Sequence, residues 1–213
     1  MLFRSATLSS LSTTQVASLT SGQITALGTA QAANMLTSQI QSITTTALAG
    51  LETLDLQAMS TEQVRAFTSD QVQALSTTQV HALKTDQLAA LTTAQVASLS
   101  SLQIAALTTT QVAAFGTAQI AAMTNSELAG LNTADIAGMS SSQLAALTTD
   151  QLTSMDPELI AAIETSDISG LTTAQVAALG TAQFSAMTAG QLNALTTAQF
   201  VAVTSGQLGG LSN

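Results

Sequence analysis

An apolar residue recurs every eight positions along this chain, from Phe3 to Leu211, without an insertion or a deletion. If each octad is counted from that residue as slot one, slot one is Leu, Met, Phe, Ile or Val in all 27 occurrences. Slot six is apolar in all 26 octads, slot five is Gln in 19, slots two and three are mostly Thr or Ser, and slot eight is small. A fixed period of this kind predicts a repeat architecture in which each unit stacks on its neighbours.

One continuous helix cannot carry this pattern, because eight residues leave a drift of about 80° per octad and the apolar positions would sweep around every face. The chain must therefore turn once per octad. Thr or Ser in slot two with Gln in slot five is the capping box of a helix start, and slots one and six then form the hydrophobic staple. We predict an all-α solenoid with one short capped helix per 8-residue repeat.

The same period runs through the whole sequence, with no linker and no shift in composition. We therefore expect a single octapeptide-repeat solenoid over residues 1–213. It holds about 26 repeats at residues 3–210 and a partial repeat at residues 211–213.

Two details of the octad stay open at this level. The N-cap is either slot two or slot three. In the second case slot two is the left-handed residue that closes the preceding helix, which suits the slot-two residues Gly28, Gly116, Gly180, Lys84, Glu52 and Glu164. The Gln of slot five either closes the capping box or forms a side-chain ladder along the stack, and the two roles are compatible.

The acidic residues support the helical prediction. All twelve lie in slots two, four or five, the first turn of each predicted helix, where the helix dipole favours negative charge. The rival architecture is a β-solenoid, since Thr and Val in short repeats can stack as strand ladders. The abundance of Ala, Gln, Leu and Met favours helices, and Pro157 suits a helix start.

Composition excludes several classes of function. The net charge of −9 includes only three Lys and Arg residues, which argues against phosphate contacts to nucleic acid or anionic membranes. Polar residues interrupt every octad, so no run reaches the roughly 18 apolar residues that a spanning helix needs, and we expect no membrane insertion. Without Cys there is no disulfide or thiolate metal site. No apolar stretch follows Met1 to Ser5, so no secretory signal is expected.

No residue stands out for chemistry, and we expect no catalytic residue, no cofactor and no metal. His81, the only histidine, lies in solvent-facing slot seven without a distinct nucleophile or carboxylate partner. The acids from Asp150 to Asp167 match no calcium-binding loop. Besides Phe3, slots one and six hold four phenylalanines that we assign to the core: Phe67, Phe115, Phe184 and Phe200. The Thr and Ser of slots two and three offer one alternative, an uncharged face that binds ice, a glycan or another surface.

The run Leu-Thr-Thr-Ala-Gln-Val-Ala, seen at residues 91–97 and 171–177, resembles repeat tracts of large bacterial surface or secreted adhesin-like proteins. The resemblance implies an extracellular or cell-surface stalk, matrix or filament component and supplies no catalytic residues. We therefore predict a non-enzymatic structural protein that serves as a spacer or polymerises into a filament. Its expected partner is another copy of itself, stacked head to tail through uncapped solenoid ends.

Overall fold

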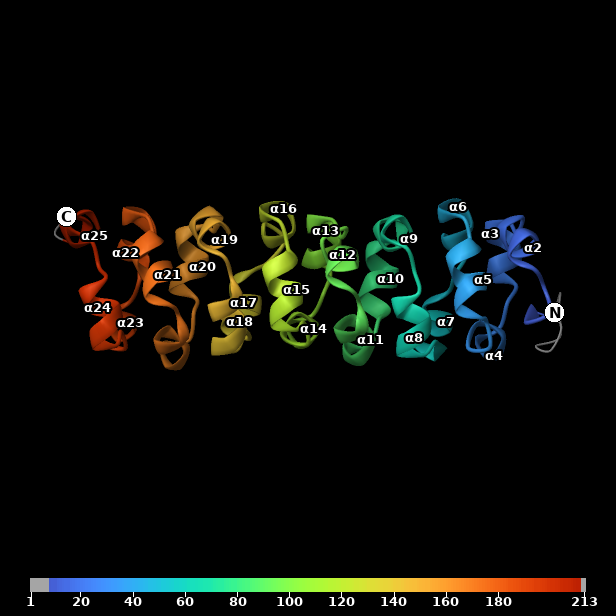
Figure 1. The fold of residues 1–213 in the computed structure, drawn as a ribbon, viewed down its shortest axis with the longest axis horizontal. Helices are drawn as coiled ribbons and strands as arrows, with labels where there is room; N and C mark the ends of the chain where they lie inside the picture. The colour runs from blue at the N-terminus through green and yellow to red at the C-terminus, as the bar shows by residue number, and fades with distance from the viewer. Residues whose placement is uncertain (1–7, 212–213) are drawn as a thin grey trace. The chain divides into compact units, whose positions relative to one another are not determined.

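A computed structural model describes residues 8–211 of the chain, and every helix in it is one turn or two long (Figure 1). Phe3, Arg4, Thr7 and the last two residues of the partial repeat lie outside the described residues. The chain divides into two compact units, Met1–Leu107 and Thr108–Asn213. The prediction of a single solenoid domain over residues 1–213 stays a prediction, and each unit is described by itself.

The first unit contains twelve helices within its described part: α2 (Thr13–Ala17), α3 (Ser21–Thr25), α4 (Thr29–Ala32), α5 (Thr37–Ser42), α6 (Thr45–Leu48), α7 (Thr53–Ala58), α8 (Thr61–Arg65), α9 (Ser69–Ala74), α10 (Thr77–Ala82), α11 (Thr85–Ala90), α12 (Thr93–Val96) and α13 (Ser101–Ala105).

The second unit contains, within its described part, α14 (Thr109–Ala113), α15 (Thr117–Ala122), α16 (Asn125–Leu128), α17 (Thr133–Ala137), α18 (Ser141–Ala146), α19 (Thr149–Ser154), α20 (Pro157–Ala161), the 3-10 helix η1 (Thr165–Gly170), α21 (Thr173–Ala178), α22 (Thr181–Ala186), α23 (Ala189–Asn193), α24 (Thr197–Val201) and α25 (Ser205–Gly210). Residues 8–211 hold no strand, so the all-α solenoid of one short capped helix per octad is confirmed over the β-solenoid.

Slot two is the N-cap of these helices. Ser76 shows the usual geometry: its backbone is extended, its hydroxyl accepts the Gln79 N–H at 3.2 Å, and its own N–H donates to Gln79 Oε1 at 2.8 Å. Both halves of the capping box are therefore made, as the Thr/Ser and Gln pattern predicts. Each box satisfies two backbone groups that a helix start leaves open.

The alternative register, with slot three as the N-cap, is wrong. The slot-two glycines Gly28, Gly116 and Gly180 have φ values of −101°, −72° and −66°, and none of the described residues has a positive φ. Lys84 also lies at an N-cap although its side chain makes no cap bond, because its N–H still donates to Gln87 Oε1 at 2.9 Å. The slot-five side chain, rather than the slot-two side chain, thus determines at which residue the helix begins.

This division of roles gives a prediction on helix capping in the second unit. Replacing Thr172 with alanine removes the hydroxyl that accepts the Gln175 N–H at 3.1 Å and should lower the free energy of unfolding by about 1 kcal/mol. Gly180→Ser supplies a capping hydroxyl where the helix has none and should raise the free energy of unfolding by a few tenths of a kcal/mol. Urea unfolding of the two variants and the parent chain measures both. If Thr172→Ala and Gly180→Ser gave the same change in the free energy of unfolding, the slot-two hydroxyl would have no capping role.

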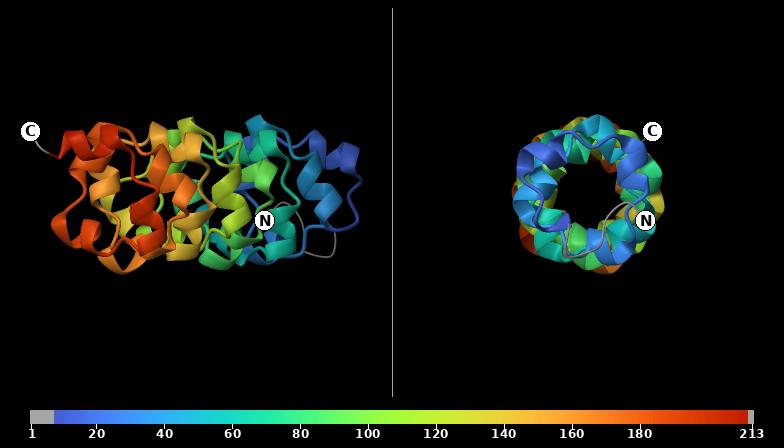
Figure 2. Two further views of the ribbon diagram at one scale, coloured as in Figure 1. Left: turned by 60° about the vertical axis from the view of Figure 1, so that its left-hand side comes forward. Right: turned by 90° about the vertical axis from the view of Figure 1, so that its right-hand side faces the viewer.

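Within each unit, helices pack on the third helix further along the chain, as α2 on α5 and α7 on α10 in the first unit and α14 on α17 in the second. In the right-hand view of Figure 2 the first unit faces the viewer, and its backbone winds around the space that its side chains fill. Three octads therefore make up about one turn of the coil. The period alone does not specify this number, because it follows from the angle between successive helices.

The core of both units consists of slots one and six. Slot-six residues such as Ile24, Leu88 and Ile160 are fully buried, and each contributes roughly 1.5–3 kcal/mol relative to an exposed position. Slot eight must be small because helices approach closely there. A Cβ on Gly50 would clash with the Ser21 carbonyl oxygen in the preceding turn. Tertiary packing of this kind, rather than intrinsic propensity, keeps helices of four to six residues folded.

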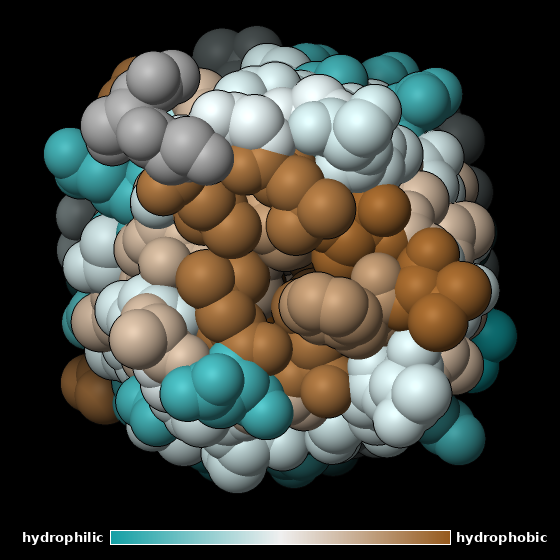
Figure 3. Space-filling view, turned by 90° about the vertical axis from the view of Figure 1, so that its left-hand side faces the viewer, coloured by the Kyte–Doolittle hydropathy of each residue, from teal (hydrophilic) through white to brown (hydrophobic). Residues whose placement is uncertain are grey.

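Three of the four phenylalanines lie in the core as predicted, and the assignment of Phe200 to the core is wrong. Phe67, Phe115 and Phe184 are buried, whereas Phe200 is 59% exposed. Phe200 belongs to the last described turn of the second unit, with Val201, Leu208 and Leu211, which are also exposed. Figure 3 shows apolar side chains gathered at the centre of this end of the unit, with polar ones around them. In the interior of each unit, slot-six side chains like Phe200 are covered by the following turn.

Candidate functional site

The most regular polar feature of the molecule is the row of slot-five glutamines, most of which are buried. Within each unit the side-chain Nε2 donates to the slot-six carbonyl 31 residues earlier and to the slot-one carbonyl 28 residues earlier, over 2.6–3.5 Å. The glutamines that do so are Gln39, Gln63, Gln71, Gln79, Gln87 and Gln103 in the first unit, and Gln143, Gln151, Gln175, Gln183, Gln191, Gln199 and Gln207 in the second.

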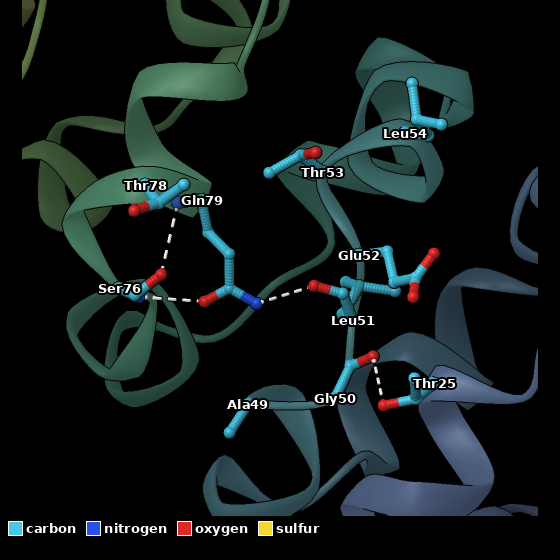
Figure 4. Close-up of a pocket in the computed structure, with 10 residues that line it drawn as sticks. All are labelled: Thr25, Ala49, Gly50, Leu51, Glu52, Thr53, Leu54, Ser76, Thr78 and Gln79. Atoms are coloured by element: carbon cyan, nitrogen blue, oxygen red, sulfur yellow. Dashed lines mark hydrogen bonds between the residues drawn. The ribbon is translucent and has the colours of Figure 1, made fainter.

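Gln79 shows how one amide joins two turns (Figure 4). Its Oε1 accepts the N–H of Ser76, while its Nε2 donates to the carbonyls of Leu48 and Leu51 at 2.9 and 2.8 Å. The side chain thus caps its own helix and clamps the preceding turn. Both roles left open by the sequence are present, and the ladder is made between side chain and backbone rather than between side chains. Because buried polar groups cost free energy unless they are paired, these contacts fix the spacing of the turns.

The same region of the first unit holds a shallow, open pocket of about 470 Å³ beside Gln79 (Figure 4). Hydroxyl groups of Thr25, Thr53 and Ser76 line it, and Leu54 forms an apolar rim. Glu52 is the one ionisable side chain of the lining, so the pocket offers a carboxylate without a second acid or base. Thr25 Oγ1 already donates to the Gly50 carbonyl at 3.0 Å, which engages that hydroxyl in joining two turns.

Asp55, which directly follows the lining residues Glu52, Thr53 and Leu54 in the sequence, occupies slot five where most octads have Gln. Its side chain is 1% exposed, and its Oδ2 has no hydrogen-bond partner. Burial raises the pKa of the Asp55 carboxyl above its usual 3.8; the N–H of Glu52 lowers it in part, and the Glu52 carboxylate raises it further. From the sequence, Asp55 is expected only to be one of the acids in the first turn of a helix. Its sequence signal is an acid in a slot that is mostly Gln, which it shares with Glu127, Asp135 and Asp167; the unpaired Oδ2 distinguishes Asp55 within the described residues.

His81 is exposed, in the slot where the sequence analysis places it on the surface. Its Nδ1 lies 2.6 Å from the carbonyl oxygen of Ala106, in an open hollow lined by Thr77 and Thr78. The residues that line this hollow are Thr77, Thr78, His81 and Ala106.

The acids from Asp150 to Asp167 stand at helix starts instead of converging on one point. Within residues 8–211 no group of three His, Asp or Glu side chains is placed to hold a metal ion. The acids of α19, α20 and η1 each lie in the first turn, as with Asp150, Glu158 and Asp167. Their position matches the charge preference of a helix N-terminus.

The Thr and Ser residues of slots two and three lie on the outer surface. Many slot-two hydroxyls accept a backbone N–H of their own helix, as Thr68 accepts from Gln71 at 3.1 Å. The capping role thus accounts for these hydroxyls. The slot-three residues are the first residues of the helices and are exposed or half-buried in most turns. In the described part of the chain, no helix combines the length and the apolar character needed to cross a lipid bilayer.

The repeat itself is found in other proteins. The pattern of the ALTTAQ repeat matches more than half of the chain, at residues 48–85, 73–101, 80–117, 88–125, 120–157 and 160–197. The chain matches no curated protein. Repeat chains that fold into helical solenoids are typically structural or binding proteins and not enzymes. The unbroken octad, the capped helices and the matched segments together place this chain in the ALTTAQ repeat family.

Proposed function

We propose that this chain is a non-enzymatic structural protein that acts as an extracellular stalk or spacer, or as the subunit of a filament. The observation that carries the proposal is the clamp of most slot-five glutamines on the turn before them, which recurs at the same 28- and 31-residue spacing in both units. A fold with one contact repeated along its length provides a firm spacer. The extracellular location rests on the resemblance of the repeat to tracts of surface and secreted proteins.

Assembly from copies of the chain has its own support. At the start of the described coil, the side chains of Gln15 and Gln23 are not buried, and they make the cap bond without a clamp on another turn. At the other end, Phe200 and Leu208 are exposed. A second copy that placed its first turn against this end would cover these apolar side chains and supply donors to the carbonyls beneath. Such a head-to-tail contact repeats without closing and produces a filament.

The experiment is electron microscopy of the purified protein together with mass determination by light scattering on the same sample. Filaments of uniform width support the filament subunit, whereas discrete particles of 21.5 kDa contradict it and leave the stalk or spacer. Two end variants sharpen the test. Gln15→Glu with Gln23→Glu alters one end, and Phe200→Lys with Leu208→Lys alters the other. Neither variant alone should polymerise, and their mixture should give particles of twice the monomer mass.

A surface-binding module is the second candidate, because Thr and Ser residues recur on the outside of every turn. The uncharged, evenly spaced hydroxyls and methyls could bind ice, a glycan or another ordered surface. Replacing the exposed slot-three residues Thr77, Thr85 and Thr93 with Glu should then abolish binding to ice or to a glycan array while the fold is retained. If the parent chain binds neither, this candidate fails.

A further inference from the structure

Asp55 breaks the glutamine ladder in the middle of the first unit. Its helix α7 packs on α4 of the preceding turn, as the other helices of the unit pack on their own predecessors. The 31- and 28-residue offsets of the ladder set Asp55 opposite the carbonyls of Ile24 and Leu27. A glutamine at this position would donate to both oxygens, as Gln63 does to Ala32 and Met35 in the following octad.

An ionised aspartate cannot replace that donor. Its side chain is one methylene shorter than that of glutamine, and both of its oxygens are hydrogen-bond acceptors. One oxygen accepts the N–H of Glu52, and the other, Oδ2, is buried without a partner. The Ile24 carbonyl accepts the N–H of Leu27 at 2.9 Å, whereas no group in residues 8–211 donates to the Leu27 carbonyl. Two buried hydrogen-bond acceptors, Oδ2 of Asp55 and the Leu27 carbonyl oxygen, therefore lie between these two turns without a donor hydrogen.

We propose that protonation of Asp55 controls the contact between the turns of α4 and α7, which we call the joint. The neutral carboxyl donates a hydrogen bond through Oδ2 to the Leu27 carbonyl and holds the two turns together (the closed joint). The ionised carboxylate cannot donate this bond, and the contact weakens (the open joint). The shorter side chain reaches across when the two turns approach, and burial holds the pair away from water. Loss of the proton sets a carboxylate against carbonyl oxygens in a buried site, which costs free energy. The joint lies inside the first unit and is independent of whether the chain forms filaments.

The charges around the joint are few. Glu52 precedes the same helix, and its carboxylate raises the pKa of Asp55, as burial does. Helix α4 carries no titratable residue, and α10 carries His81, which is exposed in slot seven. In the neighbouring helix α8, Glu62 and Arg65 are also exposed. No buried cation therefore opposes the effect of burial on the carboxyl.

The sign of the pH dependence follows from this direction. The Asp55 carboxyl binds its proton more tightly in the folded protein than in the unfolded chain. The protonated carboxyl therefore stabilises the folded state fully at pH values below the pKa of the unfolded chain, near 3.8. It is lost as the pH rises toward the raised pKa of the folded state and changes no further above it. Between the pKa of Asp55 in the unfolded chain and its raised pKa in the folded protein, the population of the open joint rises by up to about tenfold per pH unit.

The test is amide hydrogen exchange of the full chain as a function of pH, read as protection factors in α4 and α7, for the parent chain and for Asp55→Gln, Asp55→Asn and Asp70→Asn. The parent should lose protection in these two helices as the pH rises from about 4, by up to about tenfold per unit. Asp55→Gln should abolish this loss and give the highest protection at neutral pH. Asp70→Asn removes an exposed carboxylate of the same charge and should keep the parent profile.

Three results would overturn the proposal. Equal protection at every pH in the parent and in Asp55→Asn would show that the joint is satisfied without a proton on Asp55, as by a bridging water. Protection that is independent of pH and rises with added potassium or calcium chloride at fixed ionic strength would assign the site to a bound cation. A loss of protection spread evenly over all helices would equally exclude a joint at α4 and α7.

Discussion

Replacing Gln79 with alanine should lower the free energy of unfolding of the chain by about 4 kcal/mol. The substitution removes the donor that joins α10 to the turn before it, through Leu48 and Leu51, and the acceptor of the Ser76 N–H. Each lost hydrogen bond costs about 1 kcal/mol, and a buried acceptor left unpaired costs roughly 1–3 kcal/mol more. The Leu48 carbonyl still accepts the N–H of Leu51 in the variant. The cost of an unpaired buried acceptor therefore comes mostly from the Leu51 carbonyl. Urea unfolding followed by circular dichroism measures the change.

Gln15→Ala is the matched control for Gln79→Ala. Gln15 closes the same capping box, with the Ser12 N–H donating to its Oε1 at 2.8 Å, but makes no contact with another turn through Nε2. Its loss should cost about 1 kcal/mol, the value of a cap. The difference between the two variants isolates the clamp on the preceding turn. If the two substitutions destabilise the chain equally, the ladder contributes nothing beyond capping.

The local structure could be predicted from the sequence because its causes lie within one octad. The pair Ser76 and Gln79 specifies a helix start by side-chain chemistry, and the apolar slots one and six follow from the same turn. The ambiguity at slot two arises because neither Gly28 nor Lys84 has a side chain that can accept a backbone N–H of the helix. The structure resolves it through the slot-five glutamine, whose Oε1 accepts the slot-two N–H whatever the slot-two side chain is.

The relation between turns could not be predicted in the same way. The stacking of each helix on the third helix further along depends on the angle between successive helices, and many nearly equal octads are compatible with several angles. The clamp of Gln79 on Leu48 and Leu51 therefore has no signature in the period itself. The special character of Asp55 was hidden for the same reason. An acid in the first turn is favourable for an isolated helix, and only the buried carbonyls of another turn make it costly.

Phe184→Ala should lower the free energy of unfolding by about 4 kcal/mol, because it removes the largest fully buried side chain of the described core and leaves a cavity. Phe184 lies in slot six of α22, where the following turn covers it. Helices this short have little stability of their own, so the cavity cannot be offset locally. Thermal and urea unfolding of the variant measure the loss.

Phe200→Ala provides the comparison, since Phe200 has the same side chain in the same slot of the same unit but is 59% exposed. It should change the free energy of unfolding by less than about 1 kcal/mol, because little apolar area leaves the core. The two variants also separate folding from assembly. If copies of the chain stack through this end, Phe200→Ala should reduce the mass measured by light scattering while its unfolding curve stays near that of the parent. An unfolding loss as large as that of Phe184→Ala would instead place Phe200 in the core of the protein in solution.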